Sequence, residues 1–300
     1  MRQRHLWQTL LLFCMSASAG AADFTLDYTY ERPPLKMMGV IESGDGGKLV
    51  ATVLALADRG GLGSLPRRLE VDSSGGSVQE AARIASLIEL LRMSTSVPGT
   101  GYTKGGRAGI CASACFLVWL AGHWRFAAAY YGPNTDGIER QQAAVSHRVG
   151  GMVGLHRPYL DLSESTSTDM VAAQSQQRRA IANLRTYLQN RNVSSELIGR
   201  MMAHSSKNIY WLRPEEVNAL ANSPEYEELL AANCGYRNTI LTSESSRADI
   251  EASLHESSSA VQAKLATCSR ELIGRLRALE LPILFAQLRK GWRPWTATSN

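Results

Sequence analysis

The segment Leu69–Val78, with the sequence LEVDSSGGSV, marks a change from one kind of secondary structure to another. Its apolar, alternating start predicts a strand, and the run that follows, 77–93, has apolar residues at the spacing of a helix. Ser77 and Glu80 are typical of a capping box at the helix start. Paired glycines at such a helix entry let the chain turn sharply. They also let backbone N–H groups approach a negatively charged group.

Further strand and helix patterns alternate on both sides of this unit. Strand patterns are found at 35–41, 67–72, 94–102 and 152–156. Helical patterns are found at 48–61, 77–93, 113–122 and 169–203. Alternation of this kind is typical of an α/β fold with βαβ crossovers. Beyond Ser223 the pattern is helical only, which predicts a helical extension with apolar residues at Ile250, Leu254, Val261, Leu265, Cys268, Leu272 and Leu276.

The first 22 residues are typical of a secretory signal peptide. Arg2 and Arg4 give a basic start, Leu6–Met15 is a short apolar core, and small residues follow at 16–22. The core is shorter than the roughly 20 apolar residues that span a bilayer. We therefore expect residues 1–22 to be removed and the mature protein to be periplasmic or secreted.

Charge and cysteine content narrow the partners of the mature chain. The formal charge of +5 falls to about +3 when the two arginines of the signal are removed, so we expect no nucleic acid partner. Four cysteines remain, and an even number in an oxidising compartment favours disulfides. Neither cysteine pair has a histidine at ligand spacing, so we expect no metal and no cofactor. The predicted pairs are Cys111 with Cys115 and Cys234 with Cys268.

Two further segments carry residues suited to catalysis. In GICASACFLVWLAG (109–122), Ser113 comes just before an apolar helix, where it is either a helix cap or a nucleophile. The next N–H, that of Ala114, could then donate to an oxyanion. In GMVGLHRPY (151–159), His156 ends a strand pattern, at a position where α/β proteins build their sites.

The order of these segments resembles the Clp protease proteolytic subunit (ClpP) and the wider ClpP/crotonase superfamily. DSSGGSV (72–78) is similar to the Ser-Pro-Gly-Gly turn of the family, and ASACFLVWLAG (112–122) is similar to its Ala-Ser nucleophile turn. VGLHRPY (153–159) and YWLRPEEVNALA (210–221) resemble two later segments of the family. The resemblance covers about Leu35 to Asn222. It implies a repeated ββα superhelix at 23–222, followed by the helical extension at 223–300.

The resemblance also implies a role for each matching residue. Ser113 would be the nucleophile and His156 the general base. The oxyanion hole would consist of backbone N–H groups from Gly76 or Gly75 and from Ala114. The third triad position, an aspartate in the family, matches Asn208, whose amide can orient a histidine but carries no charge. In a serine protease that exchange costs about 10⁴-fold in rate, and the carboxylates that could replace it are Asp136, Asp161 and Asp169.

Four interpretations of the function follow. The first is an exported serine hydrolase, a peptidase that acts on a peptide or protein substrate through an acyl-enzyme. The second is a catalytically inactive protein of the same fold, used for binding or assembly, which Asn208 favours. A crotonase-like acyl-CoA enzyme is disfavoured by export, and a Ser-Lys mechanism would use Lys104 or Lys207. Homo-oligomers are common in the family, whereas an ATP-driven unfoldase is not expected outside the cytosol.

Overall fold

The strand–turn–helix unit predicted around Leu69–Val78 lies at the centre of a mixed α/β structure, a computed structural model of the chain. The structure describes residues 21–99, 108–127, 151–158, 167–205, 208–235 and 258–294. Most of the predicted signal peptide lies outside these ranges. The other predicted residues outside them are Lys104, Asp136, Asp161, Lys207, Ile250 and Leu254.

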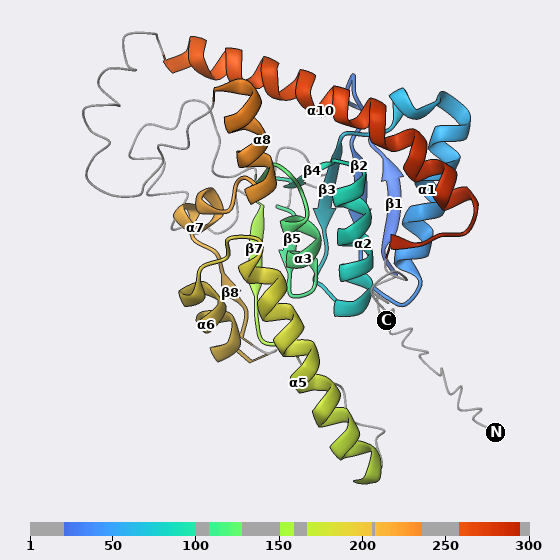
Figure 1. Ribbon diagram of the computed structural model, residues 1–300. Coiled ribbons are helices and arrows are strands. Elements are labelled where there is room, and N and C mark those ends of the chain that lie inside the picture. Colours follow the sequence, from blue (N-terminus) through green and yellow to red (C-terminus); the bar gives the residue numbers. More distant parts are fainter. Residues whose placement is uncertain are drawn as a thin grey trace, which may run out of the picture.

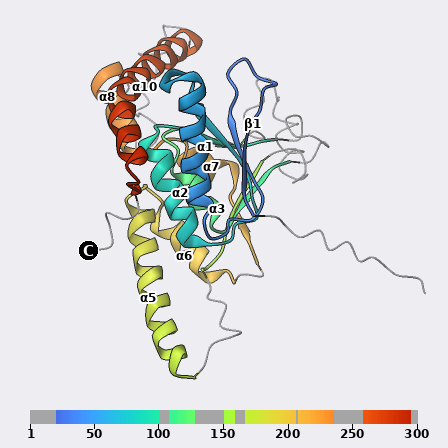
Figure 2. The ribbon, with the colours of Figure 1, turned by 90° about the vertical axis from the view of Figure 1, so that its right-hand side faces the viewer.

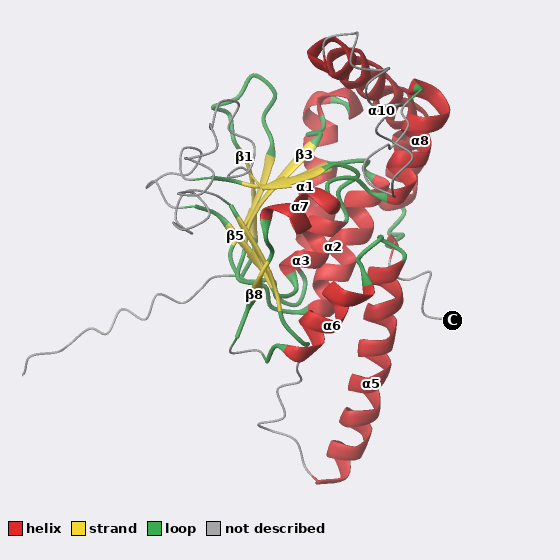
Figure 3. Cartoon of the chain, turned by 90° about the vertical axis from the view of Figure 1, so that its left-hand side faces the viewer, coloured by secondary structure: helices red, strands yellow, loops and turns green. Residues whose placement is uncertain are grey.

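The larger sheet has five strands in the order β1-β2-β3-β4-β6. Their bounds are β1 (Asp23–Leu26), β2 (Leu35–Met38), β3 (Arg68–Asp72), β4 (Ser94–Val97) and β6 (Arg125–Ala127). β1 pairs antiparallel with β2, and the remaining neighbours are parallel. Helices gather on one side of the strands (Figure 3). Three helices connect successive strands along the chain: α1 (Asp45–Gly60), α2 (Val78–Leu90) and α3 (Cys115–Leu120).

A second, three-stranded sheet joins the first at the end of β3. It has the order β5-β7-β8, with bounds β5 (Ile110–Ala112), β7 (Met152–Leu155) and β8 (Tyr210–Trp211). The Ser73 N–H donates to the Ile110 carbonyl (2.7 Å), and the Ala112 N–H donates to the Ser73 carbonyl (3.0 Å). The residue after β3, Ser73, pairs in parallel with Cys111 of β5, and β5 is itself parallel to β7. The carboxyl ends of these three strands therefore lie close together.

The remaining helices surround this double sheet. Their bounds are η1 (Leu62–Ser64), α5 (Ser167–Gln189), α6 (Ser195–Ala203), α7 (Pro214–Ala219), α8 (Pro224–Cys234) and α10 (Ser258–Arg289). In Figures 1 and 2, α10 crosses one end of the molecule and α5 extends from the other. The C-terminal half of α10 joins the main core, since Phe285 and Leu288 are fully buried there. No helix in the described ranges is long and apolar enough to cross a bilayer.

The predicted capping box of α2 is formed in one half only. The Ser77 hydroxyl accepts from the Glu80 N–H (3.2 Å), as expected. The Glu80 carboxylate, however, accepts from the Gly46 N–H (3.0 Å) at the start of α1. It is not needed at the cap, because the Ser77 N–H already donates to the Ile41 carbonyl (2.8 Å). Glu80 therefore ties α2 to α1, which explains why its side chain is buried.

Candidate active site

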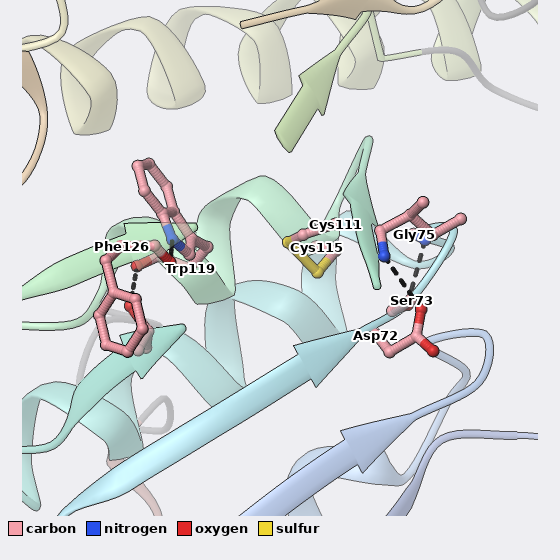
Figure 4. Close-up of a disulfide and its surroundings, with 9 residues drawn as sticks. Asp72, Ser73, Gly75, Cys111, Cys115, Trp119 and Phe126 are labelled. Carbon is pink, nitrogen blue, oxygen red and sulfur yellow. Dashed lines mark hydrogen bonds between the residues drawn. A yellow bond between two sulfur atoms is a disulfide. The ribbon is translucent and has the colours of Figure 1, made fainter. Parts of the chain in front are cut away.

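Three chain turns meet where the two sheets join. The turns are residues 73–77 after β3, residues 113–114 after β5, and His156 after β7. The first two turns are close together because Ser73 forms a parallel β-bridge with Cys111 of β5. In Figure 4, the Cys111–Cys115 disulfide lies beside the turn that carries Ser73 and Gly75. Each turn follows a parallel strand at its carboxyl end, the usual place for a site in α/β proteins.

Ser113 occupies a sharp strand-to-helix turn with an unusual backbone. Its φ is 58°, in the left-handed region that a residue with a side chain rarely adopts. Two contacts hold it there. The Ser113 N–H donates to the Gly154 carbonyl of β7 (2.9 Å), and a disulfide joins Cys111 and Cys115 on either side of it. The side chain is half-buried at the surface of a small pocket.

The glycine turn packs directly against this serine. A Cβ on Gly75 would lie 2.6 Å from the Ala112 carbonyl oxygen, 2.6 Å from the Ser113 Cβ and 3.0 Å from the Ala114 nitrogen. A Cβ on Gly76 would lie 2.2 Å from the Ile41 carbonyl oxygen. Both glycines also have a positive φ, 101° and 132°. The turn therefore needs glycine because two backbones approach it closely.

The two glycines differ in whether their backbone N–H group is available to bind an oxyanion. The Gly75 N–H donates to the Ser73 hydroxyl (3.1 Å). Within the described part of the chain, no acceptor is bonded to the N–H of Gly76 or to that of Ala114. Of the two alternatives left by the sequence, Gly76 with Ala114 is the pair whose donors are available for a ligand.

His156 is buried at the end of β7, with 7% of its surface exposed. Its Nδ1 lies 2.8 Å from the Arg157 carbonyl oxygen. A carbonyl only accepts, so Nδ1 carries the proton, and in the neutral ring Nε2 is left as an acceptor. A second hydrogen bond holds the turn after β7 in place, because the Arg157 N–H donates to the His204 carbonyl (2.9 Å) at the end of α6.

Ser113 and His156 line the same pocket. Its volume is about 10 Å³, room for roughly one water molecule. Among the hydrogen bonds between described residues, none joins the Ser113 side chain to that of His156. The pocket is otherwise apolar, and its other lining residues are Val78, Ala114, Phe116, Leu117, Pro158, Leu184 and Met201. The structure thus brings together the predicted nucleophile, the predicted base and the predicted donor at Ala114.

Asn208 lies apart from this group. It is exposed, its backbone N–H donates to the Ser205 carbonyl (3.0 Å), and its side chain makes no hydrogen bond to His156. The Nδ1 of His156 is instead bonded to the Arg157 carbonyl. This backbone acceptor had no signal in the sequence, because a carbonyl is present at every residue. Of the alternative carboxylates, only Asp169 falls within a described helix, α5.

Both predicted cysteine pairs form disulfides in the structure. Cys111 and Cys115 are joined within the Ser113 turn, and Cys234 joins α8 to Cys268 of α10. Within the described ranges, no three histidine, cysteine or carboxylate side chains gather in a way that could hold a metal ion.

A larger cavity of about 440 Å³ lies between the end of α2 and helices α8 and α10. It shares no lining residue with the Ser113 pocket. Its walls carry two ion pairs, Arg92 with Glu280 and Arg191 with Glu89. Burial lowers the pKa of His123, another lining residue, to about 4. The carboxylates and guanidiniums of this cavity are thus largely satisfied by one another, and Ser113 and His156 lie in the smaller pocket instead.

Comparisons with known proteins place few constraints on the chain. No family model matches it, and no curated protein matches it. Among solved structures, one match is a mutant of the 1510-N membrane-bound stomatin-specific protease. The identity is 14%, the TM-score is 0.35, and the match covers 62% of this chain and 73% of that one. A TM-score of 0.35 is too low for this match to indicate a function for the chain.

Proposed function

We propose that this protein is a serine hydrolase, a peptidase whose nucleophile is Ser113 and whose general base is His156. One observation carries the proposal. The two side chains line one small, otherwise apolar pocket at the carboxyl ends of the adjoining parallel strands β5 and β7. The left-handed turn at Ser113 supports it further, because a nucleophile exposed by a strained strand-to-helix turn is a recurrent design in hydrolases.

The reaction follows from the positions of the donors and acceptors. Nε2 of His156 takes the hydroxyl proton of Ser113 as Oγ bonds to the substrate carbonyl carbon. The N–H groups of Gly76 and Ala114 donate to the oxyanion that forms. Collapse of the tetrahedral intermediate breaks the peptide C–N bond, and His156 gives its proton to the leaving amine. Water, deprotonated by the same imidazole, then hydrolyses the ester on Ser113.

In this proposal the Arg157 carbonyl takes the orienting role expected of Asn208. The carbonyl fixes the tautomer with Nε2 unprotonated, which a base requires. It carries no formal charge, so it stabilises the imidazolium less than a triad aspartate does. We therefore expect a slower hydrolase than one with a complete Ser-His-Asp triad.

We further propose that the chain is an exported member of the ClpP/crotonase superfamily. Its catalytic domain would be 23–222, its helical extension 223–300, and its substrate a peptide or protein. The two disulfides support export, because such bonds persist mainly in oxidising compartments. Assembly into a homo-oligomer is part of the same proposal, because homo-oligomers are common in that superfamily.

A binding protein of the same fold is the second candidate. One observation favours it: the Asn208 side chain is exposed and is not among the residues that line the pocket of Ser113 and His156. In this interpretation the pocket would be a remnant, and the turn at Ser113 would serve only the packing of α3.

Covalent labelling with a fluorophosphonate probe separates the two candidates. We expect the wild-type protein to label, Ser113→Ala not to label, and His156→Gln to label at least about 100-fold more slowly, since general base catalysis contributes roughly that much. Ser64→Ala is the matched control, because Ser64 is exposed and bonds only locally to Gly61. A folded wild-type protein that does not label would exclude the hydrolase and favour the binding protein.

A further inference from the structure

We propose that the Cys111–Cys115 disulfide positions Ser113, so that the nucleophile is competent only while this bond is formed. The inference rests on the proposed hydrolase function and adds a redox condition to the same site. In a reducing compartment the chain would remain inactive, and it would become active after oxidation in an exported state.

The disulfide closes the smallest ring that contains the nucleophile. Cys111 belongs to β5 and Cys115 is the first residue of α3, so the bond spans four positions with Ser113 midway. The two Cα atoms are 5.2 Å apart, and neither cysteine is exposed. Only one residue separates each cysteine from Ser113, so a displacement of either sulfur shifts the backbone at Ser113.

The turn also has little intrinsic preference for this shape. A left-handed residue other than glycine costs about 1–2 kcal/mol, so the φ of 58° at Ser113 persists only because its surroundings impose it. One contact is the hydrogen bond from the Ser113 N–H to Gly154. The close approach of Gly75 is a second, and the covalent ring is the third.

Reduction would act directly on this geometry. It adds two electrons and two protons from a dithiol and replaces the S–S bond by two thiols. A disulfide holds its two sulfurs about 2 Å apart, whereas unbonded heavy atoms repel below about 3.5 Å. The sulfurs must therefore separate by more than about 1 Å, in a core that is closely packed.

The strand β5 and the helix α3, at the two ends of the ring, are both held in place. The turn between them is therefore the part that moves when the bond is broken. Cys111 is held by its pairing with Val153 and by the bridge to Ser73. Cys115 is held in α3, which is buried along its whole length. The displacement then falls on Ser113 and on the Ala114 N–H. A misplacement of about 1 Å at reacting groups costs on the order of 100-fold in rate.

The second disulfide provides a matched control. Cys234 and Cys268 join α8 to α10, and neither lines the Ser113 pocket. Removing this bond tests the general loss of a cross-link, whereas removing Cys111–Cys115 tests the loss of the ring around the nucleophile.

The experiment compares labelling kinetics of three proteins, the wild type, Cys111→Ala/Cys115→Ala and Cys234→Ala/Cys268→Ala. Each is shown to be folded by near-UV circular dichroism, and its labelling rate is measured against fluorophosphonate concentration. We expect the first variant to lose about tenfold or more in maximal rate with its half-saturating concentration unchanged. The Cys234–Cys268 variant should stay within about twofold of wild type in both quantities.

A second arm uses the natural cysteines. Wild-type protein refolded in dithiothreitol should label slowly, and oxidation with glutathione disulfide should restore the full rate. If the alanine pair does not fold, Cys111→Ala/Cys115→Val, which refills most of the lost volume, is measured in its place. A maximal rate within about twofold of wild type in a folded protein without the bond would overturn the inference and leave the hydrolase standing. A wild-type protein that does not label would overturn the proposed function itself, and this inference with it.

Discussion

Gly75 and Gly76 show that a motif can serve two purposes at adjacent residues. Gly75 makes room for the Ser113 turn, and its N–H is bonded to Ser73. Gly76 packs against the Ile41 backbone and leaves its own N–H available. A substitution at Gly76 consequently disturbs the fold before it can report on an oxyanion.

We expect Gly76→Ala to lower the free energy of unfolding by about 2 kcal/mol or more. The new Cβ would meet the Ile41 carbonyl at 2.2 Å, in a backbone conformation that L residues rarely adopt. Urea denaturation measures the change. Gly63→Ala is the control, since nothing lies within 4 Å of its Cβ, and it should shift stability by no more than about 0.5 kcal/mol. Equal stabilities for the two variants would contradict this account.

Ser113 and His156 could be singled out from the sequence, because Ser113 comes just before an apolar helix pattern and His156 ends a strand pattern. The atoms that hold them could not. The carbonyls of Gly154 and Arg157 have no signature in the sequence, and only the folded backbone brings them to Ser113 and His156. Asn208 occupies the position that the resemblance indicates, yet its side chain is exposed and unconnected to the imidazole.

At the scale of elements, the length of each helix or strand determines whether the sequence predicts it. α1, α2 and α3 match their predicted ranges closely, because an amphipathic or fully apolar pattern over several residues is unambiguous. β5 and β6 have only three residues each, too few for an alternating pattern, and neither was predicted. β6 also contains a buried arginine, Arg125, whose guanidinium donates to the carbonyls of Gly122 and Leu220.

The attachment of α10 was predicted only in outline. Its apolar spacing indicates a packed helix, and Phe285 and Leu288 do pack in the core, but a charged residue also attaches it. Arg277 is buried and donates to the carbonyls of Leu91, Leu65 and Pro66. Burial lowers the pKa of this guanidinium to about 10, so it remains charged at neutral pH.

We expect Arg277→Ala to lower the free energy of unfolding by about 3 kcal/mol or more, because it leaves three buried carbonyls without their donor. Thermal or urea unfolding measures the loss. Arg289→Ala, on the same helix, removes an exposed ion pair with Asp58 and should cost no more than about 1 kcal/mol. If the two losses were equal, Arg277 would not be what holds α10.

At the scale of the whole molecule, His123 makes stability depend on pH. Burial lowers its pKa from 6.5 to about 4, so the unfolded chain binds the proton first as the pH falls. This contribution is complete above about pH 6.5 and is lost as the pH falls toward 4, on the order of 3 kcal/mol in all.

Urea denaturation between pH 4 and pH 7.5 tests this dependence. We expect His123→Gln to show a shallower loss of stability with acid than wild type, because only the histidine accepts the extra proton on unfolding. Parallel stability curves for the two proteins would show that His123 is not the group responsible.

The bonds of Arg277 also set the order in which the chain can complete its core. The carbonyls of Leu65, Pro66 and Leu91 accept from a residue between 186 and 212 positions further along. A nascent chain that has emerged only as far as α8 lacks that partner, and it lacks Phe285 and Leu288 as well. The core around the larger sheet is therefore incomplete until the last turns of α10, which contain Phe285 and Leu288, have been synthesised.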